Sequence, residues 1–430
     1  MGGRSGLTAR PPPLAPPHRG EGKTNKDILR VWVRTQLKIG WADLMSGLAA
    51  SYRRPDRAAA LAAVESYFGS GGDTFAAYSV RSGFDLLLQA LELKPGDEVI
   101  FSALNVKGMV RIVKEAGLIP VPVDLDLAHM GPSLERLKAA VTPRSRVFVA
   151  AHLFGTRLDL DPLFKFARSK GILAVEDCAQ AFNGRDYPGS EAADLNLFSF
   201  GPIKTATALG GALIRVRPKA LRARMRAIQS RYPLQPEAKH RKRIVQFMGL
   251  KLITSRLILG AIYRFYKSRG KDYEDSLADK VRDVAPLKTS NNLRYRPSTT
   301  MLSLMNRRLA QFDMAQVAAR QAKGERLRDL IDGAAVMPAQ ANAHHDYWVF
   351  PLLVGEPRKY IEALRAAGFD AADLPRSQHI AAPADRPGLE PVTAAKAMKD
   401  LIVLPCYDTM PDGELARQAE VIRRVAAGEA

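Results

Sequence analysis

The sequence has few cysteines and no long hydrophobic run. Only Cys178 and Cys406 occur in the 430 residues, too few for a disulfide framework, so a reducing cytosol is the expected environment. No stretch approaches the roughly 18 consecutive apolar residues that a membrane-spanning helix needs. Residues 1–27 are rich in Pro, Gly and Arg and lack the apolar core of a signal peptide. We therefore expect residues 1–35 to form a disordered basic tail.

Acidic residues are scarce in one segment. Between Arg215 and Lys271 the chain has 17 Lys and Arg but a single acid, Glu237, so this segment carries +16 of the net charge of +20. The basic character therefore belongs to this segment, because the rest of the chain is close to neutral.

Residues 240–271 mix Leu, Ile, Phe and Tyr with these cations, a composition typical of a helix lying on an anionic membrane surface. The protein would then be peripheral on the inner face of the membrane. Residues expected to face the lipid include Phe247, Leu250, Leu257, Ile258 and Phe265. The alternative is a helix packed on the protein's own sheet or on a dimer partner. Nucleic-acid binding is disfavoured, because the segment is apolar enough to need burial and contains no nucleic-acid motif.

Short apolar segments alternate with helical patterns over residues 57–215. The spacing predicts strands within 96–102, 119–126, 145–155 and 172–180, and helices within 56–68, 80–93, 106–117, 133–141 and 160–171. Such alternation indicates an α/β fold with a mostly parallel sheet covered on both faces. We expect a large domain over 36–300 with a basic insertion at about 216–290. One long linking helix over 301–331 and a small α+β unit would complete a C-terminal domain over 301–430.

Three polar clusters follow predicted strands or open a helix. They are Ser82-Gly83, Glu176-Asp177 with Gln180, and Ser199 with Lys204. In parallel sheets the carboxyl ends of the strands share one edge, where ligands bind. By itself Lys204 is compatible with a salt bridge, a phosphate contact or a Schiff base. A phosphate site, a carboxylate and a lysine together are what pyridoxal phosphate requires for its phosphate, its pyridine nitrogen and its aldehyde.

Several motifs carry a family resemblance. The segments "VEDCAQA", "FSFGPIK" and the following "GG", preceded by "AHLFG" and by residues 82–126, occur in the order and spacing of one known family. The chain resembles the DegT/StrS-type sugar aminotransferases, over about 75–215 and again over about 290–430. The most specific feature is the pair of motifs that places Asp177 and Lys204 27 residues apart. The resemblance implies fold type I of the pyridoxal phosphate enzymes, with a large domain and a small C-terminal α+β domain.

The resemblance also implies a role for each matching residue. Lys204 matches the Schiff-base lysine and proton shuttle, and Asp177 matches the partner of the pyridine nitrogen. Gln180 matches the residue beside the cofactor ring, and Ser199 a hydroxyl that binds the phosphate. The remaining phosphate contacts would come from Ser82, Gly83 and the amide of Phe84. No metal site is implied.

The chain departs from the family at three positions. Phe84 replaces a phosphate-binding threonine, and Val106 stands where an aromatic residue usually stacks on the cofactor. Arg294, in "LRYRPS", replaces an asparagine that reaches the partner subunit's cofactor, and an arginine there would still bind phosphate. We therefore expect a homodimer with shared active sites.

The resulting hypothesis is a cytoplasmic, pyridoxal phosphate-dependent aminotransferase with glutamate as the amino donor. Its acceptor would be a nucleotide-linked keto sugar or a membrane-proximal, lipid-linked ketone. Two alternatives are a sugar dehydratase relative, which the presence of Lys204 disfavours, and a non-catalytic binding or regulatory protein with the same fold.

Overall fold

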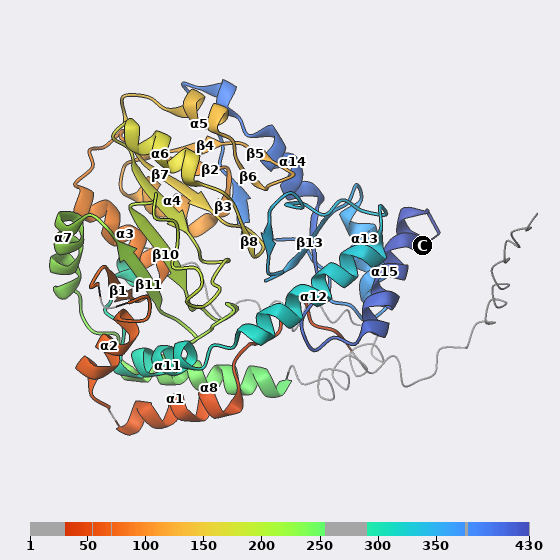
Figure 1. Ribbon diagram of the computed structural model, residues 1–430, viewed down its shortest axis with the longest axis horizontal. Helices are drawn as coiled ribbons and strands as arrows, with labels where there is room; N and C mark the ends of the chain where they lie inside the picture. The colour runs from red at the N-terminus through yellow and green to blue at the C-terminus, as the bar shows by residue number, and fades with distance from the viewer. Residues whose placement is uncertain (1–30, 54, 70, 254–289, 375–376, 430) are drawn as a thin grey trace, which may run out of the picture.

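The computed structural model describes residues 31–53, 55–69, 71–253, 290–374 and 377–429. A seven-stranded sheet forms its centre, in the order β1-β11-β10-β9-β7-β2-β4 (Figure 1). The bounds of these strands are β1 Thr74–Ala77, β2 Glu98–Ser102, β4 Ile119–Val123, β7 Ser145–Ala151, β9 Leu173–Asp177, β10 Leu195–Ser199 and β11 Ala212–Val216. The strands from β10 to β4 pair in parallel, and β11 pairs antiparallel with both β10 and β1. The α/β class with a mostly parallel sheet is confirmed.

Helices cover both faces of this sheet. One face is packed by α3 Val80–Leu91, α4 Lys107–Glu115 and α7 Lys219–Ser230. The other face is packed by α5 Leu134–Ala140 and α6 Asp161–Ser169 and, over β1, β10 and β11, by α1 Trp41–Arg53, α8 Glu237–Ile253 and α11 Thr299–Ala310. The short helix α2 Arg57–Glu65 leads into β1. Since successive side chains of a strand point to opposite faces, Leu197 packs with the first group and Phe198 with the second.

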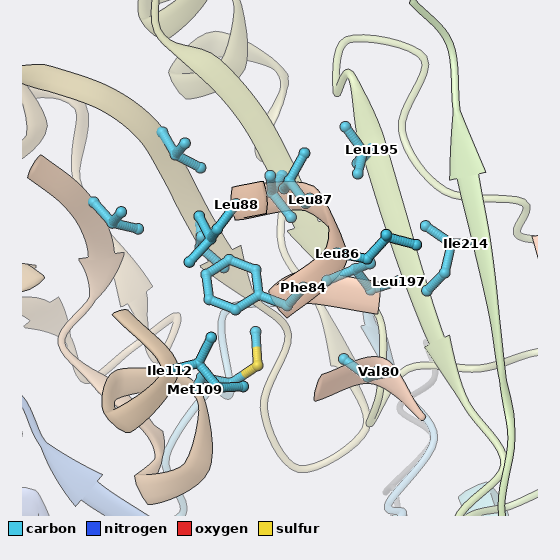
Figure 2. Packing of buried hydrophobic residues seen from close by; sticks show 14 of the residues in the cluster. Val80, Phe84, Leu86, Leu87, Leu88, Met109, Ile112, Leu195, Leu197 and Ile214 are labelled. Carbon is cyan, nitrogen blue, oxygen red and sulfur yellow. The ribbon is translucent and has the colours of Figure 1, made fainter. Parts of the chain in front are cut away.

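The helix α3 packs tightly against the sheet. Figure 2 shows the Phe84 ring among Leu88, Met109 and Ile112, and Phe84 is completely buried. At Gly83 a Cβ atom would lie only 2.6 Å from the Cδ1 of Ile214, so glycine allows the helix to approach β11. Phe84 is therefore a core residue of the large domain.

The C-terminal part has its own core. It contains α12 Met314–Ile331, α13 Pro357–Ala366, α14 Val392–Asp400, α15 Asp412–Ala426 and the antiparallel pair β13 Phe350–Leu353 and β15 Leu401–Leu404. Trp32, from the start of the described chain, is buried in this core and bonds to the backbone of Gly368 and Asp370. The folded part therefore already includes Trp32, whereas residues 1–30 of the expected tail lie outside the described residues.

Short ladders complete the fold. They pair β3 Leu104–Val106 with β14 Ser377–His379, β8 Thr156–Arg157 with β12 His344–His345, and β5 Leu125–Asp126 with β6 Gly131–Pro132. Two 3-10 turns lie at Ser290–Leu293 and Pro387–Leu389. The first two ladders join the C-terminal part to loops at the carboxyl edge of the central sheet, which is where the sequence places the site.

The expected single helix over 301–331 is wrong, because α11 ends at Ala310 and α12 begins at Met314. The side chain of Asp313 accepts a hydrogen bond from the amide of Ala315 and so caps a new helix. Phe312, between the two helices, packs against Phe182 at 5.0 Å between ring centroids. These two contacts offset the helical hydrogen bonds lost at the break.

The described part of the basic segment packs inward. Phe247 is 3% exposed among residues of α1 and α11, so the expectation that it faces lipid is wrong, and Leu250 also packs against this cluster. Lys251 is partly buried and donates to the carbonyl oxygen of Ile39 at 2.8 Å. Leu257, Ile258 and Phe265 lie outside the described residues. Among the described residues, no helix combines the length and apolar character needed to cross a membrane.

The single acid of the basic segment joins two helices. The carboxylate of Glu237, in the first turn of α8, accepts hydrogen bonds from the amides of Thr299 and Thr300 at 2.8 and 3.0 Å and from the Thr300 hydroxyl at 2.5 Å. It therefore satisfies free N–H groups at the start of α11, where the helix dipole also favours a negative charge. Burial raises the pKa of Glu237, but these hydrogen bonds outweigh burial and leave the pKa lowered.

We expect Glu237→Gln to lower the free energy of unfolding by about 1 kcal/mol, since an amide replaces a charged acceptor at a helix start. Because the pKa is lowered in the folded state, this stabilisation is present above the ordinary value of 4.5 and is lost as the pH falls through the folded value. Urea unfolding at several pH values measures the difference. The control is Glu420→Gln, which removes an exposed pair with Arg423 and should change stability by less than about 0.5 kcal/mol. Equal stability of Glu237→Gln and the unaltered protein at neutral pH would contradict this role.

Candidate functional site

Two neighbouring strands bring the predicted residues together. The strands β9 and β10 pair in parallel, with Asp177 opposite Leu197, so their carboxyl ends lie side by side. Asp177 is the last residue of β9, Ser199 is the last residue of β10, and Lys204 lies in the loop that follows β10. The sheet edge predicted from the sequence therefore does hold these three residues.

The Lys204 amine lies in an apolar position. The side chain is partly buried, and within the described residues Nζ has no hydrogen-bond acceptor. Nζ lies 4.2 Å from the ring centroid of Trp348, over its face. Desolvation, opposed by the charge of Asp177, lowers the pKa of Lys204 to about 8. A substantial fraction of this amine is therefore neutral and nucleophilic near neutral pH.

The carboxylate of Asp177 has one oxygen that accepts no hydrogen bond within the described residues. Its Oδ1 accepts a hydrogen bond from the amide of Ala179 at 2.9 Å, while Oδ2 accepts none within the described residues. The residue is 6% exposed. Burial raises its pKa, opposed by the Ala179 amide and by the charge of Lys204. The Oδ2 oxygen is therefore available to accept a hydrogen bond from a ligand.

The side chains of Ser199 and Gln180 differ in their hydrogen bonds. The Ser199 hydroxyl accepts only a long contact from the amide of Gly201 at 3.4 Å, and within the described chain it donates to no acceptor. The side-chain oxygen of Gln180 accepts the amide of Phe154 at 2.8 Å, which holds the loop after β7. Ser199 is free to bind a ligand, whereas Gln180 also has a structural contact.

The predicted phosphate contacts lie at the start of a helix. The helix α3 begins at Val80 with Ser79 as its cap, so Ser82 and Gly83 lie in its first turn. Ser79 accepts the amide of Ser82 through its side chain and that of Gly83 through its carbonyl oxygen. The Ser82 hydroxyl donates to the carbonyl oxygen of Leu293 at 2.7 Å. Phosphate binding by Ser82, Gly83 and the Phe84 amide remains a prediction.

Arg294 forms an ion pair with an acidic residue of the same chain. Its Nε and Nη2 donate to the carboxylate of Asp85, on α3, at 2.9 and 3.1 Å. Within the described residues Nη1 makes no hydrogen bond, and the side chain is 39% exposed. Arg294 thus keeps donors free on the outside of the large domain.

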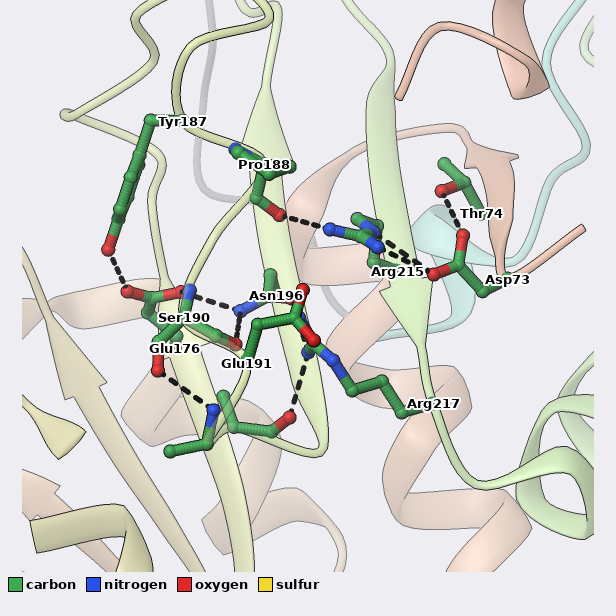
Figure 3. A network of polar contacts seen from close by, with 12 residues as sticks. Asp73, Thr74, Glu176, Tyr187, Pro188, Ser190, Glu191, Asn196, Arg215 and Arg217 are labelled. Carbon is green, nitrogen blue, oxygen red and sulfur yellow. Dashed lines mark hydrogen bonds and ion pairs between the residues drawn. The ribbon is translucent and has the colours of Figure 1, made fainter. Parts of the chain in front are cut away.

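Glu176, the neighbour of Asp177, has a structural role. Its carboxylate accepts hydrogen bonds from Tyr187, from the amide of Ser190 at 2.8 Å and from the side chain of Asn196 at 2.5 Å (Figure 3). It also accepts from Nε2 of the buried His152 at 2.8 Å. Burial opposes ionisation, but these partners lower the pKa of Glu176 to about 2. The group is therefore a fixed anion inside the protein.

The cluster around Glu176 also contains side chains of the types that bind metal ions. Ligand atoms of His152, Glu176 and Cys178 lie within 4.8 Å of one another. However, Nδ1 of His152 accepts the amide of Leu158 at 3.1 Å, so Nε2 carries the proton that it donates to Glu176. Burial raises the pKa of the Cys178 thiol well above its ordinary value. These groups form a hydrogen-bonded network rather than a set of free metal ligands.

Two further residues at this edge were not identified from the sequence. Trp348 contacts Lys204, and Asn105 in β3 has a buried side-chain nitrogen without a partner in the described chain. Trp348 lies within an apolar run and Asn105 within a strand-like segment, so neither pattern distinguishes it from an ordinary structural residue.

The donor and acceptor groups at this edge fit pyridoxal phosphate. Lys204 offers an amine with no hydrogen-bond partner, Asp177 an acceptor oxygen without a donor, and Ser199 a free hydroxyl. They would meet the aldehyde, the ring nitrogen and the phosphate, respectively. The fit rests on the types of these three groups, which are a free amine, a free acceptor oxygen and a free hydroxyl, and on their position at one edge of the sheet.

Similarity to known proteins was found at both the sequence and the structural level. The chain is 32% identical over 157 residues to a UDP-N-acetyl-3-dehydro-α-D-glucosamine 3-aminotransferase of Acidithiobacillus ferrooxidans, covering 35% of this chain and 42% of that protein. It is 34% identical over 147 residues to a GDP-perosamine synthase of Caulobacter vibrioides, covering 34% and 39%. The chain thus aligns with about two fifths of the length of these curated relatives.

The fold extends over nearly the whole chain. The crystal structure of the aminotransferase TlmJ from Streptoalloteichus hindustanus superposes with a TM-score of 0.68 at 17% identity, covering 93% of this chain and all of that one. This likeness shows the fold. The sequence model of the DegT/DnrJ/EryC1/StrS aminotransferase family matches residues 62–253, which include Asp177, Ser199 and Lys204. Over this region, the chain is similar to the DegT/DnrJ/EryC1/StrS aminotransferase family.

Proposed function

We propose that the protein is a pyridoxal phosphate-dependent aminotransferase. The observation that carries the proposal is the Lys204 amine, held without a hydrogen-bond acceptor beside the carboxyl end of β9. When bound, the cofactor supplies an aldehyde that accepts amines and a ring that withdraws electrons. The match of residues 62–253 to the model of an aminotransferase family supports this assignment.

In this proposal Lys204, Asp177 and Ser199 have separate roles. With a pKa of about 8, Lys204 is neutral in roughly a quarter of the molecules at pH 7.5, against about one in a thousand for an ordinary lysine. The neutral amine of Lys204 would hold the cofactor at its aldehyde with loss of water, and the free amine would accept and return a proton at Nζ. Asp177 would accept a hydrogen bond from the ring nitrogen and favour its protonated form. Ser199 would donate its hydroxyl to the phosphate.

The acceptor we propose is a nucleotide-linked keto sugar, with glutamate as the amino donor. Support for the acceptor comes from the two relatives, which are named for a UDP-linked dehydro sugar and for GDP-perosamine. A lipid-linked ketone is the variant suggested by the basic segment. The presence of Lys204 at the family position disfavours a dehydratase, and cofactor attachment separates the enzyme from a non-catalytic binding protein.

Lys204→Ala should abolish both cofactor attachment and transamination, because it removes the amine that forms the bond and carries the proton. The protein is mixed with pyridoxal phosphate, treated with borohydride and digested, and the mass of the peptide containing position 204 is measured. The control is Lys170→Ala, which removes a lysine near the Phe166 ring and should leave attachment unchanged. Attachment to Lys204→Ala at the level of the unaltered protein would refute the assignment.

Asp177→Asn serves as the companion variant in that experiment. An amide cannot stabilise a protonated ring nitrogen as a carboxylate does, so turnover should fall about 100-fold or more while attachment at Lys204 persists. This pattern distinguishes loss of electron withdrawal from loss of the amine. An Asp177→Asn enzyme with unchanged turnover would exclude the ring-nitrogen role.

We also propose a homodimer in which Arg294 binds the phosphate in the partner subunit's site. The free Nη1 donors and the partial exposure of the Arg294 side chain support this role. Arg294→Ala should remain dimeric in sedimentation velocity and bind pyridoxal phosphate about 10-fold more weakly, because a charge-assisted phosphate contact is lost. An active monomer at micromolar concentration would contradict the shared site.

A membrane-facing surface is proposed in a revised form. The helices α1 and α8 pack against each other, and each exposes an apolar stripe at helical spacing. The stripes comprise Trp41, Met45 and Tyr52 on α1, and Val245 and Leu252 on α8. Arg241, also on α8, lies over the Tyr52 ring at 4.9 Å and places a cation beside them. Exposed apolar and cationic side chains together suit contact with an anionic lipid surface. They replace the buried Phe247 in the proposal.

Co-sedimentation with vesicles tests this surface. We expect binding to vesicles containing phosphatidylglycerol that weakens with salt, and little binding to neutral phosphatidylcholine. Changing Val245 and Leu252 together to Ser should reduce binding several-fold, whereas Val392→Ser, at an exposed site on α14, should not. Equal binding to both vesicle types, or none, would remove the membrane and the lipid-linked acceptor from the proposal.

A further inference from the structure

Trp348 contacts two consecutive residues of the catalytic loop. Its indole N–H donates to the carbonyl oxygen of Ile203 at 2.8 Å. Its ring face lies under Nζ of Lys204, with 4.2 Å between Nζ and the ring centroid. One side chain therefore binds the loop backbone and the amine at once.

Trp348 comes from the C-terminal part and is itself firmly held. Its amide donates to Oδ1 of Asp346 at 3.0 Å. Arg320, on α12, donates through Nε to the carbonyl oxygen of Asp346 at 2.6 Å and pairs with its carboxylate at 3.2 Å. The position of the indole is thus tied to α12.

The same turn is tied to the large domain through Gly155. The amide of Asp346 donates to the carbonyl oxygen of Gly155 at 2.8 Å. A Cβ atom at Gly155 would lie 2.0 Å from Oδ1 of Asp346, and its φ of 93° is one that glycine adopts readily. The preceding residue, Phe154, bonds through its amide to Gln180. Trp348 is therefore connected to both sides of the site.

We propose that Trp348 is a positioning residue for Lys204: its indole N–H fixes the loop, and its ring face holds the protonated amine within the site. The proposal deepens the proposed function and rests on it for its catalytic meaning. Among the described residues, the charged group that acts on Lys204 is Asp177, at the end of β9. Asp346 accepts from the backbone amide of Trp348 and pairs with Arg320, and neither residue is among the charged groups that shift the pKa of Lys204.

The contact has a consequence for the protonation of the amine. A cation over an aromatic face is stabilised, so the ring opposes the desolvation that lowers the pKa of Lys204. Replacing the ring by an aliphatic side chain of similar bulk removes this attraction but keeps water out. The pKa of Lys204 should then fall further, by about 1.

The test titrates Lys204 in the protein without added cofactor. The protein is labelled briefly with acetic anhydride from about pH 6 to about pH 10, and acetylation of Lys204 is measured by mass spectrometry against Lys170 as internal reference. In Trp348→Leu and Trp348→Met the titration midpoint should move down by about 1. In Trp348→Phe, which keeps a ring, it should move by less than half as much. Trp41→Leu, which removes an exposed indole from α1, should leave it unchanged.

Two results would overturn the proposal. An unchanged midpoint in both aliphatic variants would show that the ring does not hold the amine. An upward shift would show that Trp348 serves only to exclude water. Thermal unfolding of each variant identifies any that do not fold. If one of the two aliphatic variants does not fold, the other still gives the titration midpoint. Because the readout uses neither cofactor nor turnover, it stays valid if the aminotransferase proposal fails.

Discussion

The parallel pairing of β9 with β10 is the contact on which the site depends. It sets Asp177 and Ser199 side by side at the carboxyl edge of the sheet, although they are 22 positions apart in the sequence. The pairing is reinforced from within by Glu176, whose carboxylate binds Asn196 on β10, Ser190 in the connection and His152 after β7. A fully partnered buried anion of this kind is rigid, because moving any strand would leave a charge without hydrogen bonds.

Glu176 and Asp177 show how environment assigns different roles to adjacent carboxylates. They point to opposite sides because successive residues of a strand alternate. Several donors surround Glu176 and lower its pKa to about 2, whereas Asp177 accepts a single amide and has its pKa raised by burial. The carboxylate of Glu176, which accepts several hydrogen bonds, supports the sheet. The carboxylate of Asp177 keeps one oxygen available for a ligand. The difference lies in their neighbours, since the two side chains differ by one methylene.

The basic segment has a structural function near the loop that carries Lys204. Its helix α8 caps α11 through Glu237 and packs Ile244 beside Gly47 of α1, while Phe247 is buried in the same cluster. Arg243, on the same helix, donates to the carbonyl oxygen of Leu209, which precedes the glycine pair after Lys204. These contacts explain why cations interrupt the apolar pattern: several of them bind backbone carbonyl oxygens of neighbouring segments. The exposed stripe on α8 is what remains available for an external surface.

Local patterns were sufficient to predict the alternating strands and helices, the order of the motifs and the candidate residues Asp177, Ser199 and Lys204, because periodicity and strand ends are properties of short segments. They failed at Phe312, where the break between α11 and α12 depends on packing against the distant Phe182. They also failed at Phe247, because an apolar helix face has the same pattern whether lipid or another helix covers it. The placement of Trp348 over Lys204 and the pairing of Arg294 with Asp85 each join residues more than 140 positions apart. Contacts of that range have no signature in the local pattern, and only the packing of the C-terminal part against the central sheet decides them.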